Sequence, residues 1–232
     1  MSKKYQHLFF DLDHTLWDFE RNSEETLREL FEELAMQEVI KVDFPIFMQC
    51  FRKINHALWN AYNQYQTDRK TIRTQRFELI RKELDCPPSE VFEQMNLAYL
   101  DRCPQKPHLI PHSVEILEYL QKDYILHIIS NGFEEIQKQK MQSSGILHFF
   151  AEIVTSESTQ YRKPNKEIFE YALSKIKTSK EGTLMIGDNL TTDIAGANNA
   201  GIDAIFYNPE QIIHNEQVTF EVISLKDIKA IL

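Results

Sequence analysis

Hydrophobic residues change their spacing along this chain of 232 residues. Residues 7–10, HLFF, form a short apolar run that a polar turn ends, which is typical of a buried strand. From about residue 22 to residue 101 the apolar positions recur every three or four residues, as Leu27, Leu30 and Phe31 do, and no glycine interrupts them. This spacing predicts about four helices that pack as a small bundle.

Beyond residue 104 the pattern changes, and short apolar runs alternate with stretches of helical periodicity. Pro104, Pro107 and Pro111 mark the change. The predicted strands are 124–130, 151–156, 183–187 and 203–207, and the predicted helices are 112–121, 133–141, 165–176 and 190–200. Strands that alternate with helices form a parallel sheet with helices on both faces.

We therefore expect an α/β protein with a Rossmann-like parallel sheet that a helical domain interrupts after the first strand. The sheet domain takes residues 1–16 and 104–232, and the helical domain takes residues 17–103. The length of the chain suits one large domain that carries a smaller insert.

The charge and the cysteines narrow the class of protein. The net charge of −9 argues against general affinity for nucleic acid, which needs basic patches. No run approaches the roughly 18 apolar residues of a membrane helix, and Asp11 comes too early for a signal peptide. Cys50, Cys86 and Cys103 include no CxxC pair, which favours free thiols in a reducing compartment. We expect a cytoplasmic protein, a monomer or small homo-oligomer, with a small-molecule partner and no nucleic-acid or membrane partner.

Polar residues follow the predicted strands at one edge of the expected sheet, where ligands of such sheets bind. These residues are Asp11, Asp13 and Thr15 after the first strand, Ser130, Asn131 and Gly132 after the second, Lys163 in the loop after the third, and Asp188 and Asp193 after the fourth. Each has an ordinary explanation by itself, such as a turn residue or a helix-capping carboxylate. Their arrival together at one edge favours a catalytic site.

These four segments resemble the motifs of the haloacid dehalogenase (HAD) superfamily. DLDHT is similar to the first motif, DxDx[TV], SNG to the second, the Lys163–Pro164 pair to the third and GDNLTTD to the fourth, GDxxxxD, in the same order. The resemblance covers the whole chain, because a helical insert after the first motif is the type I cap of the superfamily. It implies a HAD-like core with a helical cap.

The residue types suit phosphoryl transfer. A carboxylate can attack phosphorus and form an aspartyl-phosphate, and we expect Asp11 to be this nucleophile. Because the reaction joins two anions, it needs a divalent cation and hydrogen-bond donors. We expect Mg²⁺ on the carboxylates of Asp11 and Asp188, and the resemblance adds the main-chain carbonyl of Asp13. Asp193 is either a further ligand or a group that orients metal-bound water, and Thr15 supports the site from outside the ligand set.

The phosphate itself needs donors. We expect the Ser130 hydroxyl and the backbone N–H groups of Asn131 and Gly132 to bind phosphate oxygens. Lys163 supplies positive charge to the phosphoryl group and steadies Asp11.

Asp13 decides between two hydrolase chemistries. Side chains two residues apart on a strand point the same way, so Asp13 can serve the same site as Asp11. It can protonate the leaving oxygen and then activate water as a general base. The dehalogenases that name the superfamily use the first aspartate on carbon without Mg²⁺ and lack the second, so Asp13 favours a phosphatase.

The leaving group is predicted from longer stretches. FFDLDHTLWDF, SNGF, RKPNKEIFEYAL and GDNLTTDIAGANNAG resemble the YjjG-type pyrimidine 5′-nucleotidases of bacteria, which implies a nucleoside 5′-monophosphate substrate. The alternatives are a phosphoglycolate or sugar-phosphate phosphatase, a 2-haloacid dehalogenase and a phosphate-binding protein without turnover.

Two aromatic residues, three arginines and one histidine stay open between a functional and a structural interpretation. Trp17 and Phe19 could contact the leaving group or pack the hinge. Arg73 and Arg76 lie with Arg69 on one helical stripe, which is either a solvated face or a surface that holds an anionic substrate. His14, inside the first motif, could line the site or only pack.

Overall fold

The computed structural model describes residues 4–232, which form two compact units. The core unit runs to Phe19 and resumes at Pro107, and the cap unit is Glu20–Lys106. Each junction lies three residues beyond the predicted 16/17 and 103/104. The reason is that the two crossing segments pair with each other, since the Asp18 amide donates to the His108 carbonyl at 3.1 Å.

The core unit is built on one parallel sheet of six strands in the order β3-β2-β1-β4-β5-β6. The strands are β1 (His7–Phe10), β2 (Ile125–Ser130), β3 (Phe150–Thr155), β4 (Thr183–Gly187), β5 (Asp203–Tyr207) and β6 (Phe220–Val222). The predicted parallel α/β sheet is confirmed. The short strand β6 was not predicted, because two of its three residues are exposed and give no apolar run.

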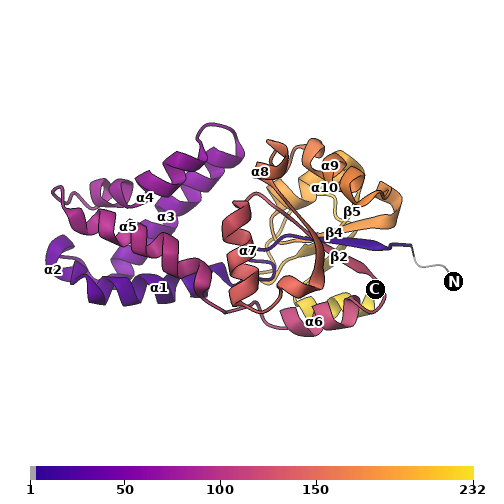
Figure 1. Cartoon of the computed structure of the whole chain (residues 1–232), viewed down its shortest axis with the longest axis horizontal. Helices are drawn as coiled ribbons and strands as arrows, with labels where there is room; N and C mark the ends of the chain where they lie inside the picture. Colours follow the sequence, from indigo (N-terminus) through magenta and orange to yellow (C-terminus); the bar gives the residue numbers. More distant parts are fainter. Residues whose placement is uncertain (1–3) are drawn as a thin grey trace. The chain divides into compact units, whose positions relative to one another are not determined.

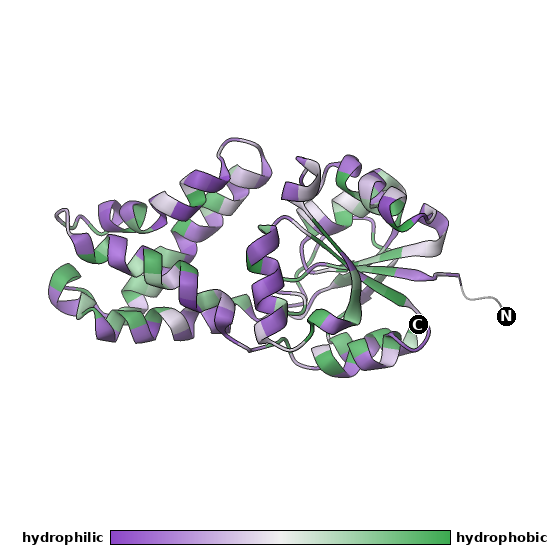
Figure 2. Cartoon of the chain, viewed as in Figure 1, coloured by the Kyte–Doolittle hydropathy of each residue, from purple (hydrophilic) through white to green (hydrophobic). Residues whose placement is uncertain are grey.

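Helices cover both faces of this sheet. They are α6 (Ser113–Leu120), α7 (Glu134–Ser143), α8 (Ser156–Thr159), α9 (Lys166–Ile176) and α10 (Ala195–Ala200). Figure 1 shows α9 and α10 on one side of the strands and α6 on the other. Phe9 and Met185 of the sheet pack with Phe169 and Ala197 of α9 and α10 in a fully buried cluster. Figure 2 shows largely hydrophobic strands among helices of mixed character, as expected for helices buried on one side.

The cap unit is entirely helical within the described residues. Its helices are α1 (Phe19–Glu33), which begins at the junction, α2 (Met36–Ile40), α3 (Phe44–Asn63), α4 (Arg69–Glu83) and α5 (Glu90–Arg102). Side chains cap three of them, because Asp43, Asp68 and Ser89 accept hydrogen bonds from the first turns of α3, α4 and α5. The predicted bundle of about four helices corresponds to α1, α3, α4 and α5, with α2 as a short extra turn.

The arginine stripe of α4 differs from the prediction at one residue. Arg69 and Arg73 are partly exposed, but Arg76 is only 4% exposed. Its guanidinium carbon lies 5.9 Å from the Phe51 ring centre and 5.2 Å from that of Tyr99. A solvated stripe is therefore wrong for Arg76, because α4 packs between α3 and α5 and buries this turn.

The three cysteines are buried free thiols. Burial raises the pKa of the Cys50 thiol to about 11, so this group stays protonated and unreactive near neutral pH. Within residues 4–232 we find no helix that combines the length and the apolar character needed to cross a membrane.

Candidate active site

The candidate site lies where the strand order of the sheet changes direction. β1 is the first strand of the chain and has β2 on one side and β4 on the other. Ligands of such sheets bind at the carboxyl ends of the strands at this point. Asp11 directly follows β1, and its amide donates to the Ile186 carbonyl of β4 at 2.9 Å. The main chain therefore places Asp11 beside the end of β4, where Asp188 lies.

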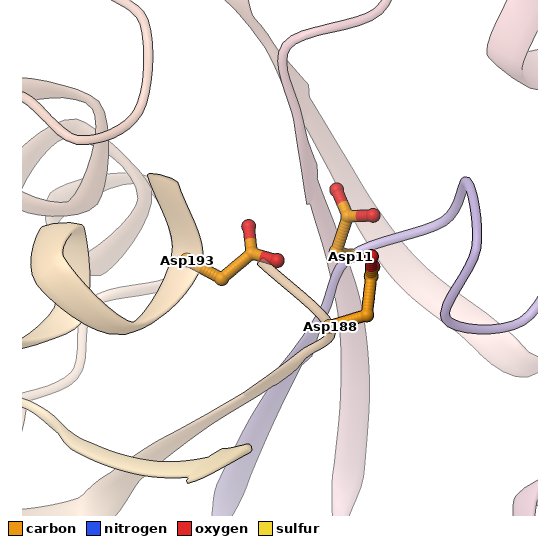
Figure 3. Close-up of side chains that lie close together, drawn as sticks. All are labelled: Asp11, Asp188 and Asp193. Atoms are coloured by element: carbon orange, nitrogen blue, oxygen red, sulfur yellow. The ribbon is translucent and has the colours of Figure 1, made fainter. Parts of the chain in front are cut away.

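Three carboxylates meet at this edge of the sheet. Asp11, Asp188 and Asp193 each have an oxygen within 4.8 Å of the others, and Figure 3 shows them gathered around one point. Thr15 donates to Asp188 Oδ1 at 2.7 Å. A Cβ on Gly187 would lie 2.3 Å from Asp193 Oδ2, so the glycine is what lets Asp193 approach the strand.

The crowding of negative charge changes the protonation of these groups. Burial raises the pKa of Asp11, and the Lys163 ammonium opposes this while Asp193 and Asp188 raise it further. Burial and the Asp193 charge raise the pKa of Asp188 to about 7. A divalent cation would remove this repulsion, and Mg²⁺ prefers carboxylate oxygens as ligands. The residues present therefore fit a Mg²⁺ site.

Lys163 balances part of this charge from within the core unit. Its side chain is 2% exposed, and its ammonium nitrogen lies 2.5 Å from Asp11 Oδ1 and 2.7 Å from Asp193 Oδ1. A third contact runs to the carbonyl of Ile129 at 2.8 Å. These contacts use all three N–H donors of the ammonium and orient both carboxylates.

Asn131 holds the Lys163 loop. Its amide oxygen accepts from the Lys163 N–H at 2.7 Å, and its Nδ2 donates to the Lys163 carbonyl at 2.9 Å. The side chain of Asn131 thus has a structural role, and the donor that was predicted to bind phosphate is its backbone N–H.

Ser130 ends β2 and receives two hydrogen bonds. Its Oγ accepts from the Gly132 N–H at 3.0 Å and from Gln137 Nε2 at 2.7 Å. The Gly132 N–H, predicted to bind phosphate, is thus paired with Ser130 in this structure. Two donors occupy both lone pairs of the hydroxyl, so Ser130 can only act as a donor toward a further group. A donor is what a phosphate oxygen requires.

The carboxylate of Asp13 contacts α7 and lies outside the group of three carboxylates. Asp13 Oδ1 lies 2.6 Å from Lys140 Nζ, and Oδ2 accepts from Gln137 Nε2 at 2.8 Å. Burial raises the pKa of Asp13, but the charge and hydrogen bond of Lys140 and the hydrogen bond of Gln137 outweigh it, and the pKa is lowered. Neither α7 residue was predicted. The one available signal was their spacing of three residues on a helix that directly follows SNG.

The two aromatic residues after the first motif differ in burial. Trp17 is fully buried, and Lys140 Nζ lies 4.6 Å from its ring centre. Of the two alternatives for Trp17, contact with a leaving group or packing, this burial favours packing, because its backbone pairs with Leu109 and draws the residue into the core unit. Phe19 is partly exposed, with its ring 5.1 Å from that of His14. His14 is exposed and has a φ of 65°, the left-handed region that favours glycine.

Known proteins resemble this chain over nearly its whole length. The HAD-hydrolase YfnB of Bacillus subtilis is 32% identical over 236 residues, which cover 99% of this chain and 96% of that protein. The pyrimidine 5′-nucleotidase PynA of Streptococcus pneumoniae is 32% identical and covers 97% of this chain and 93% of its own. The pyrimidine 5′-nucleotidase YjjG of Escherichia coli is 29% identical, with 99% and 98% covered.

A solved structure agrees with this similarity. The crystal structure of YfnB bound to magnesium matches with a TM-score of 0.87 at 31% identity, and the match covers 99% of each chain. Residues 8–207 match the family described as haloacid dehalogenase-like hydrolase. The resemblance predicted from the four motifs is thereby confirmed, and the chain belongs to the haloacid dehalogenase-like hydrolases.

Proposed function

We propose that this protein is a Mg²⁺-dependent phosphomonoester hydrolase that acts on a nucleoside 5′-monophosphate. The observation that carries the proposal is the arrangement around Asp11. A buried carboxylate is paired with the Lys163 ammonium at 2.5 Å beside two further carboxylates. Asp13, which a 2-haloacid dehalogenase lacks, is present and is held by two donors of α7.

In this proposal the metal is held by residues of the core unit alone. Asp11 and Asp188 are the carboxylate ligands, and the main-chain carbonyl of Asp13 joins them. Asp193 orients water, since its own oxygens accept from Lys163 and from the Asn189 N–H at 3.1 Å. When bound there, a divalent cation would neutralise charge between the nucleophile and the phosphoryl group. The magnesium reported for YfnB supports this assignment.

The reaction proceeds in two steps. Asp13 first takes up a proton, because Lys140 and Gln137 favour its charged form before the substrate binds. Asp11 then attacks phosphorus, the bond to the leaving oxygen breaks, and Asp13 gives that oxygen the proton. Asp13 then takes a proton from water, the water oxygen attacks the phosphorus, and inorganic phosphate and free Asp11 are formed. Ser130 and the Asn131 N–H donate to the phosphoryl oxygens, and Lys163, whose three N–H donors are already used, contributes its positive charge.

The nucleotide substrate rests on the relatives. PynA and YjjG are both named pyrimidine 5′-nucleotidases, and each is similar to this chain from end to end. A phosphoglycolate or sugar-phosphate phosphatase would use the same core residues and differ only in the leaving group.

Phosphate release with and without Mg²⁺ tests the proposal. The panel contains UMP, dUMP, AMP, phosphoglycolate and glucose 6-phosphate, with chloride release from 2-chloropropionate measured in parallel. We expect Mg²⁺-dependent release that is fastest with the pyrimidine nucleotides. Faster release from phosphoglycolate or a sugar phosphate would overturn the substrate, and metal-independent chloride release would overturn the chemistry. No turnover of any ester would favour a phosphate-binding protein.

The proposal also includes the cellular compartment and the oligomeric state of the protein. A nucleotide substrate and three free buried thiols suit a cytoplasmic enzyme. We propose a monomer or small homo-oligomer, which light scattering on the purified protein can measure.

A further inference from the structure

One helix outside the four motifs contacts both the acid–base carboxylate and the phosphate-binding hydroxyl. Gln137 of α7 is fully buried, and its Nε2 lies 2.8 Å from Asp13 Oδ2 and 2.7 Å from Ser130 Oγ. An amide nitrogen carries two N–H donors, so one donor reaches each partner. Gln137 thus joins a residue of the loop after β1 to the last residue of β2.

The packing around Gln137 is tight. A Cβ on Gly132 would lie 2.4 Å from Gln137 Nε2, so the glycine makes room for this amide. Gln137 Oε1 is buried and has no hydrogen-bond partner among residues 4–232. An apolar side chain of similar size would avoid this unpaired acceptor. The two N–H donors of Gln137, which an apolar side chain would lack, therefore explain a glutamine at this position.

Lys140 holds the other oxygen of the same carboxylate. Its side chain is 9% exposed, and Nζ lies 2.6 Å from Asp13 Oδ1. The ammonium also lies 4.6 Å from the ring centre of the buried Trp17, which restricts where it can move. Both oxygens of Asp13 therefore have a fixed donor, and both donors come from one face of α7.

We propose that Gln137 and Lys140 are positioning residues that hold Asp13 and Ser130 for catalysis. Lys140 acts through Asp13 alone, whereas Gln137 acts through both Asp13 and Ser130. The inference rests on the proposed phosphatase function and adds two residues that its motifs do not contain. Neither residue needs to touch the substrate for this role.

The test compares leaving groups. An alkyl phosphate needs a proton on its leaving oxygen, whereas 4-nitrophenyl phosphate releases a stable anion without one. Because kcat/KM reports formation of the aspartyl-phosphate, the step in which only the alkyl leaving group needs a proton, for Lys140→Met we expect kcat/KM to fall about 100-fold with the best alkyl phosphate and less than about 5-fold with 4-nitrophenyl phosphate. Lys140→Arg, which keeps the donor, should recover most of the loss.

Gln137 gives a second, different signature. Gln137→Met should lower kcat/KM with the alkyl phosphate in the same selective way and also raise the inhibition constant of inorganic phosphate, because Ser130 loses a fixed partner. Lys140→Met should leave that constant unchanged. Lys138→Met is the matched control, since Lys138 lies on the same helix with a side chain that is 51% exposed and pairs with Glu134. It should leave every constant at the wild-type value.

Several outcomes would overturn the inference. Equal losses of kcat/KM with both esters would show that the residues serve folding or general binding, and an unchanged kcat/KM would show that they have no role. If the wild type hydrolyses neither ester, the proposed function fails by itself. Crystal structures of Lys140→Met and Gln137→Met then decide the positioning, because an Asp13 carboxylate that stays in place in both variants would contradict it.

Discussion

Lys163 is a buried cation between two buried carboxylates, and these carboxylates stabilise its charge. The ammonium contacts Asp11 and Asp193 at 2.5 and 2.7 Å, and these neighbours keep its pKa raised despite burial. Burying such a group of charges costs desolvation energy. Removing one partner costs far more, because it leaves a buried charge without a counter-ion. At the scale of single residues, charge balance therefore constrains the site as much as chemistry does.

Removing this cation should destabilise the protein. For Lys163→Met we expect a loss of about 3–5 kcal/mol in the free energy of unfolding, because two buried carboxylates lose their counter-ion. Urea unfolding measures the loss. Lys166→Met is the control, since Lys166 forms an exposed ion pair with Glu170 and should give no measurable change. A Lys163 variant as stable as the control would contradict the proposed balance.

Asp11→Asn should separate activity from stability. We expect turnover to fall by about 10⁴-fold or more, because the amide cannot form an aspartyl-phosphate. Stability should fall little, since Lys163 keeps Asp193 as a charged partner at 2.7 Å and the crowding of three carboxylates is relieved. Phosphate release and thermal unfolding are measured on the same sample. Retained activity would exclude Asp11 as the nucleophile.

Mg²⁺ should stabilise the wild-type protein against heat. A cation that binds the native state alone raises the unfolding temperature, and Asp188→Asn should abolish most of the increase. The increase should weaken below pH 7, because the pKa of Asp188 is raised to about 7 and the cation must then displace a proton. Thermal scans with and without Mg²⁺ at pH 6 and 8 measure this. An Asp188→Asn variant with the full increase would place the metal elsewhere.

At the scale of elements, the end of β4 is shaped by a glycine. Asp193 comes from the turn Leu190–Ile194, a short π-helical segment, and reaches back over Gly187. π-helical turns of this kind are frequent at functional sites. The strand end and the turn therefore form one unit that places Asp193 beside Lys163.

Adding a methyl group to Gly187 should disturb the packing between the end of β4 and the turn that carries Asp193. We expect Gly187→Ala to cost about 1–3 kcal/mol in stability and to reduce activity, because the new Cβ would lie 2.3 Å from Asp193 Oδ2. Gly182→Ala, just before β4, is the matched control, since its Cβ would meet nothing closer than Thr178 Oγ1 at 3.8 Å. Equal behaviour of the two variants would show that Asp193 can move freely.

At the scale of the whole molecule, a buried histidine pair links stability to pH. His7 Nδ1 and His127 Nε2, on the adjacent strands β1 and β2, lie 3.0 Å apart. Burial, helped by the charge of His7, lowers the pKa of His127 to about 4. The unfolded chain then binds more protons than the native one between pH 6.5 and 4, so this contribution to stability is lost as the pH falls through that window.

His127→Leu should remove this dependence. Between pH 7 and 4.5 the variant should gain on the order of 2 kcal/mol relative to the wild type. The quantity to compare is the difference in the free energy of unfolding between the variant and the wild type. The raised pKa of Asp188 changes the stability of both proteins in the opposite direction over an overlapping pH range. Urea unfolding at several pH values measures it, and the exposed His148→Leu serves as control. A constant difference across the range would exclude His127 as the source.

The sequence alone determined the parallel sheet and the residues that meet at its edge. Parallel strands joined by helices bring all their carboxyl ends to one side, so Asp11, Lys163 and Asp188 had to converge once the strands were identified. The four motifs also identified the family. The roles of these residues in catalysis remain proposals that the experiments above can test.

Only the tertiary structure decided which side chains outside the motifs join the site and which leave it. Gln137 and Lys140 reach Asp13 because of how α7 turns against the sheet, and Trp17 and Arg76 are buried by partners distant in sequence. Periodicity along a chain predicts that a helix has a buried face. It cannot name the partner, because docking depends on the close packing of side chains from several elements at once.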